Sequence, residues 1–152
     1  MKAILLDMYG VIVKQTGDDF VPYVQQTFPE LDPEEIIKPW NKANMGEWSS
    51  LEIWATVGWS KYLREKFNIN QYFEVISISG DLKIRKPDER IFRLTIEKLA
   101  VNAAECLYVD DRRGYLGAAN RLGMNTILFN SRNVPYKGDV VHNFEELMNR
   151  VL

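Results

Sequence analysis

Three short segments of the sequence carry side chains that could do chemistry together. Asp7 follows one apolar run, Asp110 and Asp111 follow another, and Lys86 stands between a predicted strand and a predicted helix. Close carboxylates repel one another unless a cation lies between them, and Mg²⁺ is the natural divalent ion for oxygen ligands. An ionised Asp is also a competent nucleophile toward phosphorus, and a Lys can hold both the Asp and the phosphoryl oxygens.

The elements that lead into these residues would bring them to one place. Lys2–Leu6 is a short, continuous apolar run, which predicts a strand buried on both faces of a parallel sheet. Cys106–Val109 predicts a second such strand. Because parallel strands all end at the same edge of a sheet, and ligands of open α/β sheets bind there, we expect the three carboxylates and the Lys86 ammonium to converge.

The second half of the chain alternates between strand and helix patterns, which predicts an α/β fold with a parallel sheet between layers of helices. Asn143 and Glu146 form a capping-box pattern before the last helix. The predicted elements are a strand at Phe73–Ile78, a helix opened by Pro87-Asp88 and running to Leu99, a helix at Gly114–Leu122, a strand at Thr126–Phe129 and a helix at Phe144–Val151.

The composition excludes several other kinds of site. The 152 residues are 46% hydrophobic, enough for a sizeable core, and a net charge of -2 gives no footprint for nucleic acid or an anionic membrane. The single Cys106 excludes an internal disulfide framework, and the single His142 argues against a histidine-based triad or metal cluster. The first apolar run is too short for a signal peptide and no stretch approaches the ~20 apolar residues of a membrane span, so we expect a cytoplasmic protein.

These motifs resemble the haloacid dehalogenase-like (HAD) superfamily of hydrolases. The apolar strand followed by Asp7-Met8-Tyr9-Gly10-Val11 is similar to the family's nucleophile loop, and Tyr72–Phe92 to the segment that carries its lysine. Leu107–Asp111, followed by Gly117-Ala118-Ala119 and Gly123-Met124, is similar to its acidic metal motif. The resemblance is close over Ala3–Val13 and Tyr72–Asn130, together roughly half of the chain. Each motif is weak alone, but their order and their placement at strand ends make the combination specific.

The resemblance implies a role for each residue. Asp7 would attack phosphorus and form an aspartyl-phosphate, while Lys86 would orient Asp7 and neutralise charge. Asp111, with Asp110 beside it, would bind Mg²⁺ together with Asp7 and the backbone carbonyl of Tyr9.

The resemblance also divides the chain into two parts. Residues 1–13 and 61–152 would form the three-layer, Rossmann-like α/β/α core, and the helical patterns within residues 14–60 would form a small cap that excludes water and selects the substrate. All four tryptophans fall in this cap region, where they fit ordinary cap packing, a subunit interface or the wall of a substrate pocket: Trp40, Trp48, Trp54 and Trp59.

Tyr9 departs from the pattern of the superfamily's phosphatases, which usually carry a second Asp there to protonate the leaving oxygen and activate water. A Tyr, with an ordinary pKa of ~10, is a poor base near neutrality. The 2-haloacid dehalogenases of the superfamily do carry Tyr at this place, and halide leaves without a proton. Those enzymes need no metal, however, whereas Asp110-Asp111 indicates a metal motif, so the two ends of the site point to different reactions.

A strand that the family expects is absent from the sequence pattern. It would lie between the cap and the lysine segment and end in a Ser or Thr that holds a phosphoryl oxygen. Here Gly58-Trp59 runs almost directly into the helical pattern Ser60–Leu63, and Ser77 and Ser79, in the next predicted strand, are poor substitutes. Loss of a strand leaves a sheet edge unpaired, which favours a homodimer or strand exchange.

We therefore expect Mg²⁺-dependent hydrolysis of a small phosphorylated metabolite at Asp7, with a bias toward good leaving groups such as acyl or aryl phosphates. Two alternatives stay open: a metal-independent 2-haloacid dehalogenase, and a HAD-like chain that no longer catalyses and serves in binding or assembly. Tyr9 and the missing strand favour these alternatives. Asp88 is expected to cap a helix, and Arg112 and Arg113 to form a solvated face from which one of them could reach an anionic substrate.

Overall fold

The computed structural model describes residues 1–12, 64, 65 and 67–152 of the chain. The chain divides into two compact units, one made of Met1–Gln15 with Lys86–Leu152 and the other of Thr16–Arg85. The predicted cap at residues 14–60, its helices and its tryptophans lie outside the described residues.

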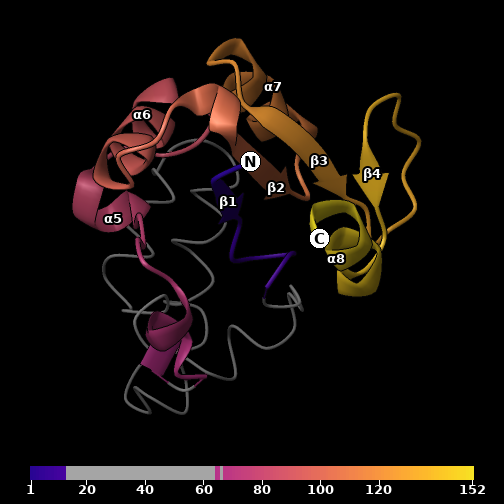
Figure 1. Cartoon of the computed structure of the whole chain (residues 1–152), viewed down its shortest axis with the longest axis horizontal. Coiled ribbons are helices and arrows are strands. Elements are labelled where there is room, and N and C mark those ends of the chain that lie inside the picture. Colours follow the sequence, from indigo (N-terminus) through magenta and orange to yellow (C-terminus); the bar gives the residue numbers. More distant parts are fainter. Residues whose placement is uncertain (13–63, 66) are drawn as a thin grey trace, which may run out of the picture. The chain divides into compact units, whose positions relative to one another are not determined.

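The first unit is built on a parallel sheet whose strands follow the order β1-β2-β3-β4 (Figure 1). Among the described residues β1 stands at one end of this order, so the predicted dimer at an unpaired edge stays a prediction. The strands are β1 (Ala3–Leu6), β2 (Cys106–Asp110), β3 (Asn125–Phe129) and β4 (Val140–Val141).

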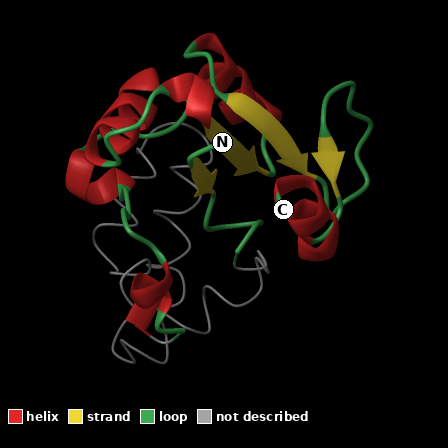
Figure 2. Ribbon diagram, viewed as in Figure 1, coloured by secondary structure: helices red, strands yellow, loops and turns green. Residues whose placement is uncertain are grey.

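Helices cover both faces of this sheet, which gives the predicted three-layer α/β/α fold (Figures 1 and 2). Side chains alternate along β2, so that Tyr108 packs edge-on against Phe92 of α6 with 4.9 Å between ring centroids, while Val109 joins the opposite face, which α8 covers. The helices are α6 (Glu89–Lys98) and α7 (Arg113–Arg121) on one side and α8 (Phe144–Val151) on the other.

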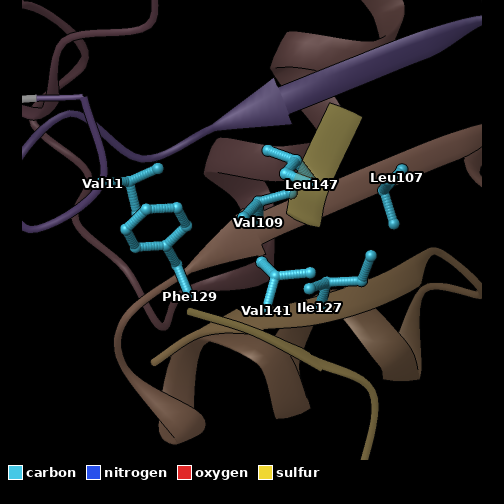
Figure 3. Close-up of a cluster of buried hydrophobic side chains, with 7 residues drawn as sticks. All are labelled: Val11, Leu107, Val109, Ile127, Phe129, Val141 and Leu147. Carbon is cyan, nitrogen blue, oxygen red and sulfur yellow. The ribbon is translucent and has the colours of Figure 1, made fainter. Parts of the chain in front are cut away.

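A buried apolar cluster fills the space between the sheet and α8 (Figure 3). It includes Val11 from the loop after β1, so burial of this side chain anchors the loop that begins with Asp7. The cluster consists of Val11, Leu107, Val109, Ile127, Phe129, Val141 and Leu147.

Side-chain caps fix where the two outer helices begin. Asp88 accepts a hydrogen bond from the Arg90 N–H (2.9 Å) at the start of α6, as predicted. At the start of α8 the Asn143 side chain accepts from the Glu146 N–H (2.9 Å), but the Glu146 carboxylate accepts from the N–H of His142 (2.8 Å). In the predicted capping box Glu146 would accept from the N–H of Asn143, but it accepts from the N–H of the preceding residue instead. The bounds of α8 are as predicted.

The predicted strand at Phe73–Ile78 is wrong. In the second unit the 3-10 helix η2 (Ile69–Tyr72) and the short helix α5 (Ser79–Leu82) flank this segment, and its residues pair with no strand in the described part of the chain. Phe73 and Ile78 do have extended backbones. An apolar, β-prone sequence favours extension, but a strand also needs a neighbour to accept and donate its hydrogen bonds.

No helix within the described ranges is both long enough and apolar enough to span a membrane.

Candidate active site

The register of the sheet brings the predicted acidic residues to one edge. Leu6 of β1 pairs with Val109 of β2, and the Asp7 N–H continues the ladder by donating to the Val109 carbonyl (2.9 Å). Asp7 therefore lies beside Asp110, which ends the neighbouring strand. One carboxylate oxygen from each of Asp7, Asp110 and Asp111 lies within 4.8 Å of the others.

Lys86 places its ammonium group among these carboxylates. Its Nζ donates to Asp7, to Asp110 (2.8 Å) and to the Tyr108 hydroxyl (2.8 Å), and its side chain is 18% exposed. Burial lowers the pKa of Lys86, but attraction to Asp7 and Asp110 outweighs it and the pKa is raised. The group is therefore a permanent cation that holds the Asp7 carboxylate.

Asp110 is fully buried and both its oxygens accept hydrogen bonds. One oxygen accepts from Lys86 and the Tyr108 hydroxyl, and the other from the Arg112 N–H (2.8 Å). Burial and the charge of Asp110 raise the pKa of Tyr108, so the phenol stays protonated and can donate. Tyr108 was not predicted as a site residue, although it lies two residues before Asp110 on the same face of β2.

Asp111 is differently placed, because one of its oxygens has no hydrogen-bond donor. Its side chain is 5% exposed, and Oδ2 accepts from the Arg132 guanidinium (2.9 Å). Oδ1 is buried and has no hydrogen-bond partner among the described residues, with Arg112 Nε 4.0 Å away. Burial, followed by repulsion from Asp110, raises the pKa of Asp111 against the opposing effect of both arginines. A buried carboxylate oxygen without a donor is costly unless a cation or ligand meets it.

Gly10 allows the loop after β1 to approach Asp111. Its φ is +90°, and a Cβ at this position would lie 2.6 Å from Asp111 Oδ2. Both the backbone conformation and the lack of space therefore require glycine here. Tyr9, between Asp7 and Gly10, is partly buried, and its predicted contribution to a metal site stays a prediction.

The donor set fits a hard divalent cation. Burial raises the pKa of Asp7, and Asp110 and Asp111 raise it further, while Lys86 acts in the opposite direction. The carboxylates thus lie close enough to destabilise one another's charges, and the buried Asp111 Oδ1 has no donor of its own. Oxygen ligands in this arrangement suit Mg²⁺.

Comparison with known proteins agrees with this geometry. Residues 56–129 match the family model described as haloacid dehalogenase-like hydrolase. The (S)-2-haloacid dehalogenase 4A of Burkholderia cepacia is 40% identical over 57 residues, which are 38% of this chain and 25% of the dehalogenase. The glyceraldehyde 3-phosphate phosphatase of Methanopyrus kandleri is 34% identical over 70 residues, which are 45% of this chain and 29% of the phosphatase. The matches thus span less than a third of each relative.

The fold is also found in a solved structure. The crystal structure of a HAD phosphatase from Thermococcus onnurineus superposes with a TM-score of 0.64 at 19% identity, covering 99% of this chain and 98% of that one. Residues 56–129, just under half of the chain, thus resemble the haloacid dehalogenase-like hydrolases in sequence, and the strand order and strand-end motifs agree with this resemblance.

Proposed function

We propose that this hydrolase cleaves a small phosphorylated metabolite in a Mg²⁺-dependent reaction in which Asp7 is the nucleophile. The donor-free buried oxygen of Asp111, whose carboxylate clusters with those of Asp7 and Asp110, carries the proposal, because a metal-independent reaction leaves it unexplained. The phosphatase relative supports the substrate class.

In this proposal each residue acts as its contacts allow. Lys86 holds the Asp7 carboxylate, and Asp7 attacks phosphorus to form an aspartyl-phosphate that water then hydrolyses. Asp110, whose oxygens already accept from Lys86, Tyr108 and Arg112, positions Lys86. Mg²⁺, held by Asp7, Asp111 and the Tyr9 carbonyl, would neutralise charge on the phosphoryl group.

Tyr9 sets the expected substrate preference. The chain has no acid at this place to protonate a leaving oxygen, so we expect aryl and acyl phosphates to react faster than alkyl phosphates. A series of aryl and alkyl phosphate esters, assayed for phosphate release, measures this preference. Equal rates across the series would contradict the substrate preference that Tyr9 predicts.

A 2-haloacid dehalogenase is the second candidate, because Tyr9 and the Burkholderia relative both favour it. In that reaction the Asp7 carboxylate displaces halide and water hydrolyses the resulting ester, with no proton needed by the leaving group. Halide release from 2-chloropropionate that persists in excess chelator would establish this function and reject the phosphatase.

The deciding experiment compares wild type, Asp7→Asn and Asp139→Asn with an aryl phosphate, in Mg²⁺ and in chelator. Asp139 is exposed in the same unit, so its variant controls for loss of one negative charge. We expect turnover in wild type and Asp139→Asn only, and only with Mg²⁺. Turnover that survives in Asp7→Asn comes from another source, and a wild type inactive on both substrate classes would favour the binding or assembly role.

A further inference from the structure

Arg132 is a cation of the site that no sequence motif indicates. It lies in the loop after β3, and its Nη2 donates to Asp111 Oδ2 at 2.9 Å. Its side chain is 70% exposed, whereas that of Asp111 is 5% exposed. Arg132 thus reaches a buried carboxylate from a position that remains largely in solvent.

The two other cations near the carboxylates are held more firmly. Lys86 is mostly buried and donates to three side chains. The Arg112 guanidinium donates to the Tyr115 hydroxyl (3.1 Å) and lies over its ring, 5.4 Å from the centroid. Arg132 has a long, exposed side chain in a loop, so water can solvate its guanidinium when it leaves the carboxylate.

We propose that Arg132 is an exchangeable counter-ion: it neutralises Asp111 before a divalent cation binds, and binding of the cation releases its guanidinium to hold the anionic group of the substrate. The proposal rests on the proposed Mg²⁺-dependent function. Arg132 would then have opposite effects on two ligands, because it competes with the divalent cation for Asp111 and attracts the anionic substrate.

Electrostatics and geometry both support this exchange. A divalent cation at Asp111 would repel a guanidinium bound to the same carboxylate. Once released, the planar fork of an arginine suits the paired oxygens of a phosphoryl or carboxylate group. Because Arg132 is exposed and Asp111 is not, Arg132 can turn toward solvent without exposing the rest of the site.

Calorimetric titration of Arg132→Gln tests both effects on the full chain. With Mg²⁺ alone we expect the variant to bind the ion more tightly than wild type, by up to about fivefold, because a competing ion pair is removed. With inorganic phosphate added to Mg²⁺-saturated protein we expect binding roughly tenfold weaker, because a charged donor is lost. Arg132→Lys keeps the positive charge but lacks the planar guanidinium, so its affinities for Mg²⁺ and for phosphate should lie between those of wild type and Arg132→Gln.

Arg150→Gln is the matched control, since Arg150 is exposed and pairs with Asp139 (3.5 Å), which is not one of the three clustered carboxylates. Unchanged or weaker Mg²⁺ binding in Arg132→Gln would overturn the exchange, as would an equal gain in Arg150→Gln or unchanged phosphate binding. A wild type that binds no Mg²⁺ would overturn the proposed function as well, which separates the two failures.

Discussion

Lys86 donates hydrogen bonds to two carboxylates and to the neutral hydroxyl of Tyr108. The phenol oxygen accepts from Lys86 (2.8 Å) and donates to Asp110, so it connects the ammonium to the fully buried acid. Such a bridge restricts where the Lys86 ammonium can lie, and with it the Asp7 carboxylate that Lys86 holds. We therefore propose that Tyr108 positions Lys86.

We expect Tyr108→Phe to lower kcat more than it changes KM, because Lys86 loses an acceptor that fixes its position. Loss of the buried hydroxyl should also lower the free energy of unfolding by about 1–2 kcal/mol. Steady-state kinetics and urea unfolding measure the two effects. Tyr115→Phe is the control, because the Tyr115 hydroxyl accepts from the Arg112 guanidinium (3.1 Å) and the variant keeps the aromatic ring. A kcat loss of equal size in both variants would contradict the positioning role.

For single residues, the sequence predicts the acidic side chains of the site better than the side chains that bond to them. Asp7, Asp110 and Asp111 could be placed at one sheet edge because each directly follows an apolar strand. Tyr108 was missed because an aromatic residue inside a buried strand looks like ordinary core. Arg132 was missed because its contact depends on the path of a loop, which residue types and spacing do not determine.

Among the elements, the loop after β1 depends most on a single residue. Gly10 and Gly123 both have a positive φ, +90° and +86°, which side chains rarely adopt. They differ in their surroundings: a Cβ on Gly10 would collide with the Asp111 carboxylate, whereas a Cβ on Gly123 would meet nothing within 4 Å. Comparing alanine variants of these two glycines therefore separates the effect of backbone strain from the effect of displacing Asp111.

We expect Gly10→Ala and Gly123→Ala both to lower the free energy of unfolding by about 1–3 kcal/mol, since each forces alanine into the left-handed region. Only Gly10→Ala should also abolish or strongly weaken Mg²⁺ binding, because Asp111 must move away from the added methyl group. Thermal unfolding and a Mg²⁺ titration make the comparison. Normal Mg²⁺ affinity in Gly10→Ala would show that Asp111 is not held in place by this contact.

The strongly patterned elements could be predicted, and the weakly patterned ones could not. β1, β2, β3, α6, α7 and α8 lie within about two residues of their predicted bounds because apolar runs, caps and helical spacing mark them. The two-residue β4 and the four-residue α5 are too short to produce a pattern. The segment Phe73–Ile78 failed for the opposite reason: its pattern favours a strand, but pairing is decided by tertiary structure.

For the whole chain, composition and strand–helix alternation predict the fold class, but not the reaction. The unit that carries the site joins two distant segments, Met1–Gln15 and Lys86–Leu152, through the pairing of β1 with β2. Asp7 comes from the first segment and Asp111 from the second. The unfolded chain does not hold these residues together, so a cation that binds both recognises the folded state alone.

Mg²⁺ should therefore stabilise the protein by mass action. At a concentration one hundred times its Kd, a ligand specific for the folded state adds about 2.7 kcal/mol to the free energy of unfolding, which corresponds to several degrees in Tm. We expect this shift in wild type and its loss in Asp111→Asn, measured by thermal unfolding in Mg²⁺ against Na⁺ at equal ionic strength. An equal shift in Asp111→Asn would place the ion elsewhere, because the variant keeps the shape of the side chain and removes one of the three charges that cluster with Asp7.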